Sequence, residues 1–133
     1  MLFRSLLVEY SKNYEGKIDL WVNLQKKLEN NPPHFHSGSF SFVIWLEIPF
    51  DINEEMDRPS SRNSNSCYPA HFEFAFNSPE NKIQMHYLPV DKKWRNKLAI
   101  FPSDLNHGVH PFYTSDDYRI SVSGNFYFDT NLL

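Results

Sequence analysis

The chain has 133 residues, an apolar fraction of 41%, an aromatic fraction of 17% and a formal net charge of −3. This size and composition fit one ordered globular domain over residues 1–133. The acidic balance disfavours nucleic acid as a partner, because proteins that bind nucleic acid concentrate basic charge on one face. The single cysteine, Cys67, excludes an internal disulfide and a thiolate metal cage. No apolar run approaches the roughly 18 residues of a membrane span, so we expect a cytoplasmic protein without membrane contact.

The first third of the chain is expected to hold a short helix and a strand. Leu2, Leu6 and Tyr10 recur at helical spacing, which predicts a helix within residues 1–14. Residues 18–24 follow and are typical of a strand. The polar stretch after them ends in two prolines at positions 32 and 33, which hold the backbone extended and exclude a helix.

Residues 39–48 alternate between an apolar and a mixed face. The even positions are Phe40, Phe42, Ile44, Leu46 and Ile48. This pattern predicts a strand whose wholly apolar face packs in the core. Residues 51–69 have no periodicity, and we expect a long loop without regular structure there.

Short strands separated by turn residues fill the second half of the chain. The expected strands are residues 72–76, 83–88, 98–101, 109–113 and 119–128. Seven or eight short strands at regular spacing predict an all-β sandwich or barrel with its core over residues 18–128.

Two histidines, His34 and His36, are separated by one residue on this extended approach. Side chains two apart on an extended backbone point the same way, so the pair forms half of a candidate metal site. A metal site needs a third ligand from elsewhere. The remaining histidines are His71, His86, His107 and His110.

A candidate anion site lies near the end of the chain. Arg119 and Ser121 alternate with apolar Ile120 and Val122, so the two polar side chains share one face of a strand. A guanidinium and a hydroxyl side by side can hold a carboxylate. If that face is interior, the cost of burying an arginine suggests an anionic ligand.

Together these motifs resemble the 2-oxoglutarate/Fe(II)-dependent oxygenases, most closely small members of that superfamily encoded by phage and marine microbes. The resemblance spans about residues 18–128 and rests on the order and spacing of several short motifs. They are residues 21–23, 34–38, 41–46, 98–102 with His107, and 119–123.

The resemblance implies a double-stranded β-helix, also called a jelly roll or cupin-like barrel, that binds Fe(II) and 2-oxoglutarate. Carried over to this sequence, His34, His36 and His107 would be the iron ligands, and Arg119 with Ser121 would bind the far carboxylate of 2-oxoglutarate. No catalytic residue beyond the metal centre is implied. His36 departs from the superfamily pattern, in which this position is Asp or Glu, and makes the site one charge more positive.

The resemblance also implies the activity, hydroxylation of a small molecule or a protein side chain that the sequence does not name. Gln84 or Tyr87 could add a hydrogen bond to 2-oxoglutarate, and the chain could form a homodimer. Two alternatives stay open: a non-catalytic jelly-roll module, such as a phage accessory protein, and a three-histidine metal cupin that does not use 2-oxoglutarate. For a phage protein, the compartment would be the cytoplasm of the infected host.

Overall fold

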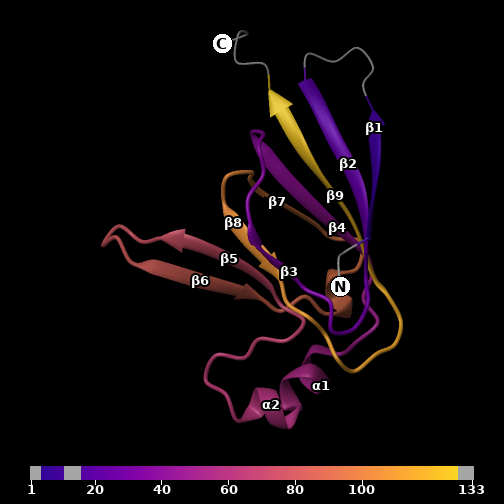
Figure 1. Cartoon of the computed structure of the whole chain (residues 1–133), viewed down its shortest axis with the longest axis vertical. Helices are drawn as coiled ribbons and strands as arrows, with labels where there is room; N and C mark the ends of the chain where they lie inside the picture. The colour runs from indigo at the N-terminus through magenta and orange to yellow at the C-terminus, as the bar shows by residue number, and fades with distance from the viewer. Residues whose placement is uncertain (1–3, 11–15, 129–133) are drawn as a thin grey trace.

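The structure is a computed structural model that describes residues 4–10 and 16–128. Within these residues, nine strands form two antiparallel sheets. The two sheets face each other at an angle (Figure 1). The five-stranded sheet has the order β1-β2-β9-β4-β7, and the four-stranded sheet has the order β3-β8-β5-β6. Their bounds are β1 Arg4–Tyr10, β2 Gly16–Gln25, β3 Asn31–His34, β4 Phe40–Glu47, β5 Phe72–Asn77, β6 Ile83–Leu88, β7 Leu98–Pro102, β8 Asn106–Val109 and β9 Arg119–Phe128.

The connectivity confirms the expected double-stranded β-helix. From β2 onward, the chain supplies the orders β2-β9-β4-β7 in one sheet and β3-β8-β5-β6 in the other. The first of these eight strands therefore pairs with the last, β2 with β9. The inner pairs follow the same rule: β3 with β8, β4 with β7 and β5 with β6. This nested antiparallel winding is the jelly-roll arrangement. Among the described residues, no helix is long and apolar enough to cross a membrane.

The expected N-terminal helix is wrong for the part of it that the structure describes. Residues 4–10 form β1, which pairs antiparallel with β2 from Arg4 opposite Leu24 to Tyr10 opposite Ile18. The hydrogen bonds of a neighbouring strand outweigh a weak helical spacing. Residues 1–3 and 11–14 of that prediction lie outside the described residues.

The expected long loop contains two short helices, α1 Ile52–Asp57 and α2 Pro59–Arg62. The side chain of Asp51 caps α1 by accepting a hydrogen bond from the backbone nitrogen of Asn53 at 2.8 Å. Glu55 is fully buried, and its carboxylate accepts hydrogen bonds from three donors. The donors are the backbone nitrogen of Tyr113, the backbone nitrogen of Thr114 and the Thr114 hydroxyl. This carboxylate fixes the segment against the rest of the chain, so the segment has regular structure without apolar periodicity.

The expected strand over residues 109–113 is also wrong. β8 ends at Val109, and Pro111, two residues further on, has no backbone donor for a ladder. Phe112 turns into the core, where it is fully buried. Of the other expected strands, 83–88 and 119–128 coincide with β6 and β9, and the rest agree within two residues at each end.

The core lies between the two sheets. Its buried apolar residues come from both sheets and from the connections at one end: Val43, Trp45, Ile48, Phe50, Ala70, Phe72, Val90, Phe101 and Phe112. Aromatic rings cross the gap, with Trp45 of β4 packing edge-on against Phe72 of β5 at 5.9 Å between centroids.

The faces of β4 are reversed relative to the prediction. The mixed face, with Ser41, Val43 and Trp45, points to the interior, and the wholly apolar face points outward. Phe40 and Leu46 on the outward face are 41% and 40% exposed. A register shift between Trp45 and Glu47 then brings Ile48, the last residue of the apolar series, into the core.

Candidate functional site

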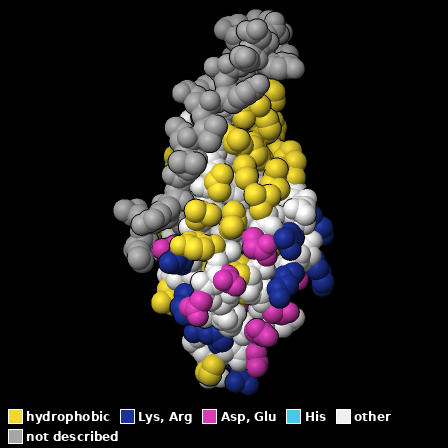
Figure 2. Space-filling view, turned by 90° about the vertical axis from the view of Figure 1, so that its right-hand side faces the viewer, with side chains coloured by type: hydrophobic (Ala, Val, Ile, Leu, Met, Phe, Trp, Pro, Cys, Tyr) yellow, Lys and Arg dark blue, Asp and Glu magenta, His cyan; other side chains and the backbone are white. Residues whose placement is uncertain are grey.

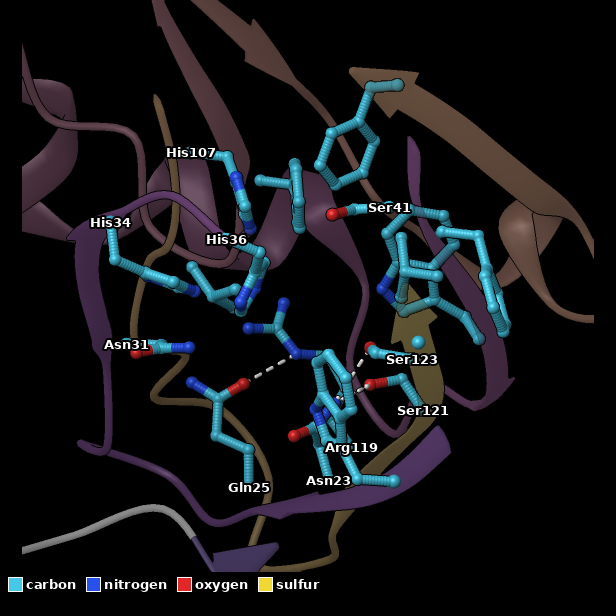
Figure 3. A pocket seen from close by; sticks show the side chains of 18 residues that line it. Asn23, Gln25, Asn31, His34, His36, Ser41, His107, Arg119, Ser121 and Ser123 are labelled. Carbon is cyan, nitrogen blue, oxygen red and sulfur yellow. Dashed lines mark hydrogen bonds between the residues drawn. The ribbon is translucent and has the colours of Figure 1, made fainter. Parts of the chain in front are cut away.

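Three histidines converge at one end of the space between the sheets (Figure 3). One ring nitrogen of each of His34, His36 and His107 lies within 4.8 Å of the others. His34 ends β3 and is the Cα partner of His107 on β8, and the extended backbone after β3 returns His36 to the same side. The spacing of one residue between His34 and His36 therefore works as the sequence predicted.

Local hydrogen bonds fix the rings of two of these histidines. Nδ1 of His34 lies 2.7 Å from the Pro32 carbonyl oxygen, and Nδ1 of His107 lies 2.8 Å from the Leu105 carbonyl oxygen. A carbonyl only accepts, so each Nδ1 carries the hydrogen and each neutral ring keeps its lone pair on Nε2. A backbone partner on one ring nitrogen is the usual support of a metal-binding histidine.

The backbone of His36 is held from the neighbouring connection. Its nitrogen donates to the Ser103 carbonyl oxygen at 2.8 Å. Ser103 is itself fully buried, and its hydroxyl accepts a hydrogen bond from Ser41 at 3.0 Å. Gly38, two residues on, has φ of 125°, which only glycine adopts readily, and this lets the chain turn into β4.

Burial keeps two histidines of the cluster, His36 and His107, uncharged at neutral pH. It lowers the pKa of His107 to about 4, with smaller contributions from the neighbouring His34 and His36. Burial, followed by repulsion from His34, also lowers the pKa of His36. Neutral imidazoles are the form that binds metal, so His36 and His107 are prepared to bind a cation without first losing a proton.

Aromatic side chains of the core surround His107. The ring of Phe72 stacks on it at 5.7 Å and that of Phe101 meets it edge-on at 4.7 Å. These contacts restrict the ring and exclude water from one side of the cluster. Trp21 of β2 lies 5.4 Å from the His36 ring on another side.

A cavity of about 390 Å³ extends from the three histidines across the inner face of the five-stranded sheet. Arg119 and Ser121 of β9 line it, on the interior face that the sequence left conditional. Arg119 is 3% exposed. The structure therefore brings all five residues of the predicted site to one cavity (Figure 3).

Neutral acceptors hold the Arg119 guanidinium. Nε donates to Oε1 of Gln25 at 2.7 Å, Nη1 to the Ala70 carbonyl oxygen at 2.8 Å and Nη2 to the His110 carbonyl oxygen at 3.1 Å. No carboxylate among the described residues forms an ion pair with it. Burial lowers the pKa of Arg119 to about 9, although the charge of Glu55 opposes this, and the group stays charged at neutral pH.

Ser121 belongs to a hydrogen-bonded polar group on the cavity wall. Asn23 of β2 donates through Nδ2 to the hydroxyls of Ser121 at 3.2 Å and Ser123 at 2.9 Å. Because each serine oxygen accepts from the amide, each hydroxyl hydrogen can be donated to a ligand. An arginine and two hydroxyl donors on one wall suit an anion.

The sequence analysis gave no role at the site to Gln25, Asn23 or Ser123, although Asn23 and Ser123 lie within the motifs that carry the resemblance. Asn23 and Gln25 are the Cα partners of Ser121 and Arg119, so the ladder between β2 and β9 sets the polar residues side by side. The alternation of polar residues with Ile18, Leu20, Val22 and Leu24 was the available signal. It becomes informative only once β2 is known to pair with β9.

The other candidates lie away from this site. Tyr87, proposed for 2-oxoglutarate, stacks on Tyr68 at 3.8 Å outside the cavity, and Gln84 is exposed on β6. His110 is oriented away from the cavity and pairs with Glu73 at 2.7 Å. Its backbone carbonyl nevertheless holds Arg119. His71 and His86 are not part of the three-histidine cluster.

Comparisons with known proteins find a family match and several similar solved structures. No curated protein matches the sequence significantly. Among solved structures, an RmlC-like cupin protein from Desulfovibrio desulfuricans is 16% identical, covering 92% of this chain and 81% of that one with a TM-score of 0.45. An RmlC-like cupin family protein with a double-stranded β-helix fold from Methanocaldococcus jannaschii is 8% identical, covering 99% and 94% with a TM-score of 0.45. A cupin domain from Bordetella pertussis is 14% identical, covering 92% of each chain with a TM-score of 0.41.

A sequence profile described as "Putative 2OG-Fe(II) oxygenase" matches residues 19–125. The match includes the three histidines, Arg119 and every strand from β3 to β8. It covers well over half of the chain. The chain therefore belongs to the 2OG-Fe(II) oxygenase family that this profile defines.

Proposed function

We propose that this chain is a 2-oxoglutarate- and Fe(II)-dependent oxygenase that hydroxylates a small molecule or a protein side chain. The observation that carries the proposal is the pairing, in one cavity, of a three-histidine cluster with a buried arginine whose hydrogen-bond acceptors among the described residues are all neutral. A metal site alone would not require that arginine. A cosubstrate with a carboxylate at its far end would.

His34, His36 and His107 are the proposed iron ligands. The three imidazoles would hold the iron, and facial sites of this enzyme class use three protein ligands so that the cosubstrate can also reach the metal. When bound, the iron supplies the redox chemistry: one oxygen atom enters a C–H bond of the substrate, and the other enters 2-oxoglutarate, which becomes succinate and CO₂. The role of the protein is to bind and orient the reactants.

Arg119 and Ser121 are the proposed partners of the far carboxylate. The guanidinium offers N–H groups beyond those used by Gln25, Ala70 and His110, since arginine has five donors and three are used in the hydrogen bonds described. The positive charge attracts the dianion to a site where burial weakens competition from water. A neutral histidine at position 36 in place of a carboxylate would add to this attraction, because it would leave a bound cation's charge uncompensated by a protein ligand.

The test is anaerobic addition of Fe(II) and then 2-oxoglutarate to the protein. We expect metal binding to be followed by a visible charge-transfer band when the keto acid binds to the metal. Arg119→Ala and Ser121→Ala should bind the metal but need more 2-oxoglutarate to form the band. Arg95→Ala is the matched control, because Arg95 is an exposed arginine that pairs with Glu47 outside the cavity.

The three-histidine ligand set also favours a second candidate, a metal cupin that does not use 2-oxoglutarate. The same titration separates the two functions. Metal binding without a band, or a band that is unchanged in Arg119→Ala, would contradict the oxygenase and support the metal cupin. Failure of the wild-type protein to bind any divalent metal would contradict both and favour a non-catalytic module.

A further inference from the structure

The outer face of the five-stranded sheet is apolar throughout its central strands. The polar cavity-lining residues of β2 and β9, and Ser41, Val43 and Trp45 of β4, occupy alternate positions, so the side chains between them point to the other face of the sheet. Phe42 and Gly124, which lie between them, also border the cavity. These outward positions, together with those of β7, form what we call the outer apolar face. Its members are Ile18, Leu20, Val22, Leu24, Phe40, Phe42, Ile44, Leu46, Leu98, Ile100, Pro102, Ile120, Val122, Gly124, Phe126 and Phe128.

Figure 2 shows this face as a continuous area of apolar side chains, with the charged side chains gathered below it. None of the sixteen residues of the outer apolar face is charged. At one end of β4, Glu47 pairs with Arg95 at 3.0 Å and forms part of the polar rim. An apolar centre with charged groups at its edge is the composition of a protein interface.

The side chains on this face are well exposed to solvent. Ile100 and Leu98 of β7 are 55% and 52% exposed, and Phe128 at the end of β9 is 62% exposed. Ile18, Leu24, Phe40 and Leu46 are 37–41% exposed. With about 170 Å² for a large apolar side chain, these seven present roughly 550 Å². The partly exposed members bring the face to roughly 800 Å², which is about one partner's share of a standard interface.

The packing inside the face indicates that it meets another flat surface. Phe42 is 8% exposed although it points outward, because its ring lies over Gly124 and packs on Phe126 at 5.1 Å. A side chain at position 124 would collide with that ring, at 2.6 Å from its atoms. The aromatic rings therefore lie along the sheet and leave a surface on which a second sheet can pack, as in a β-sandwich.

We propose that the outer apolar face is the interface of a twofold symmetric homodimer. A twofold interface brings each patch against its own copy, so the patch must be compatible with itself. An uncharged apolar face meets this condition without repulsion, and its area is sufficient. A membrane surface is a poorer fit, because the chain carries a net charge of −3 and membrane-binding faces carry basic residues.

In the dimer, the two five-stranded sheets stack back to back and the two cavities open on opposite sides. The inner face of each sheet carries Arg119 and Ser121, so the interface supports the wall that bears them. The proposal does not depend on the chemistry of the cavity. A dimer could form whether or not the chain binds 2-oxoglutarate.

The test is the mass of the chain in solution, measured by light scattering and sedimentation across a hundredfold range of concentration. We expect twice the 15.8 kDa of one chain for the wild type. Ile100→Glu and Leu46→Glu should raise the dimer dissociation constant at least a hundredfold and give the mass of one chain. Ile83→Glu is the matched control, because Ile83 is 78% exposed on the other sheet and should leave the dimer intact.

Far-UV circular dichroism checks that each variant is folded. If a glutamate variant does not fold, Ile100→Thr replaces it, since threonine keeps the branched shape that suits a strand and still weakens an apolar contact. A monomeric wild type at all concentrations, open-ended oligomers, or a dimer that survives these face variants would overturn the proposal. A dimer lost with Ile83→Glu would overturn it too.

Discussion

Arg119 is held by a neutral side chain, and a charged replacement tests whether its positive charge serves a ligand. Gln25 Oε1 lies 2.7 Å from Nε of Arg119, and the two residues are 1% and 3% exposed. Gln25→Glu places a carboxylate at this contact and neutralises the guanidinium from within the protein. We expect the variant to keep its metal affinity and to bind 2-oxoglutarate more weakly.

The expected change in the free energy of unfolding of Gln25→Glu follows from the contacts of this side chain. Two charges about 4 Å apart attract by about 4 kcal/mol at an effective dielectric constant of about 20. Burial of the new carboxylate costs several kcal/mol, which offsets this gain. The variant also loses the hydrogen bond from Gln25 Nε2 to the Glu29 carbonyl, worth about 1 kcal/mol. We therefore expect a loss of about 1–2 kcal/mol in the free energy of unfolding.

The affinity for 2-oxoglutarate should fall by a larger share than the stability of the fold. A carboxylate that meets a neutral pair instead of a free cation loses about 2 kcal/mol of charge-assisted hydrogen bonding. This corresponds to a roughly thirtyfold rise in the dissociation constant for 2-oxoglutarate. The assay is an anaerobic titration of the Fe(II) protein with 2-oxoglutarate, followed by the charge-transfer band. Metal affinity is measured separately by competition with a chelator.

Gln84→Glu is the control, because it makes the same chemical change on the exposed surface of β6. Its dissociation constant should equal that of the wild type. The reasoning would be refuted by a Gln25→Glu protein that is folded, binds the metal and shows an unchanged dissociation constant for 2-oxoglutarate. Such a result would mean that the charge of Arg119 does not contact the ligand.

Two further predictions concern buried ionisable groups. Burial lowers the pKa of His107 from 6.5 to about 4. The unfolded chain therefore binds more protons than the folded one between these values, and the metal-free protein should lose up to roughly 3 kcal/mol of stability as the pH falls from 6.5 to 4. Thermal unfolding should show this loss in His86→Gln but much less of it in His107→Gln. Glu55→Ala should reduce stability by about 3 kcal/mol or more in urea unfolding, because it removes the acceptor for three buried donors, whereas Glu54→Ala on the exposed side should have little effect. A small effect of Glu55→Ala would show that water replaces the carboxylate.

The sequence predicted the elements that repeat a simple period. β6 and β9 have the predicted limits, because their composition and turn residues are local signals. The convergence of His34 and His36 follows from the period of two along an extended backbone. Their approach to His107 depends on the pairing of β3 with β8, and there the resemblance to a family supplied what periodicity did not.

Other features depend on contacts between distant segments and have no local signal. Glu55 has no helical pattern around it, and its role depends on backbone donors of residues 113 and 114. Gln25 becomes a partner of Arg119 only through the β2–β9 ladder. β1 is a strand because β2 provides a neighbour for it, whatever the spacing of its own apolar residues suggests.

The orientation of β4 was wrong for a different physical reason. An alternating pattern shows that two faces differ, but it does not show which of them is inside. In a barrel with a ligand cavity, the interior needs polar side chains, such as Ser41, and the outside can be apolar when another surface covers it. Apolar faces are usually buried, but the surface that buries them can belong to another chain. In the proposed homodimer, the apolar face of β4 is covered by the partner chain and not by the core of its own chain.

The two faces of the five-stranded sheet also limit the changes that the gene can accept. A one-residue insertion or deletion within β2, β4 or β9 exchanges the faces beyond that point. Asn23 and Ser121 would then point to solvent, and Phe40 or Val122 would fill the cavity. Insertions in these strands should therefore be tolerated at the ends or in pairs, while the connections between strands can vary in length. A deletion scan read out by folding would reveal this even–odd pattern without any knowledge of the substrate.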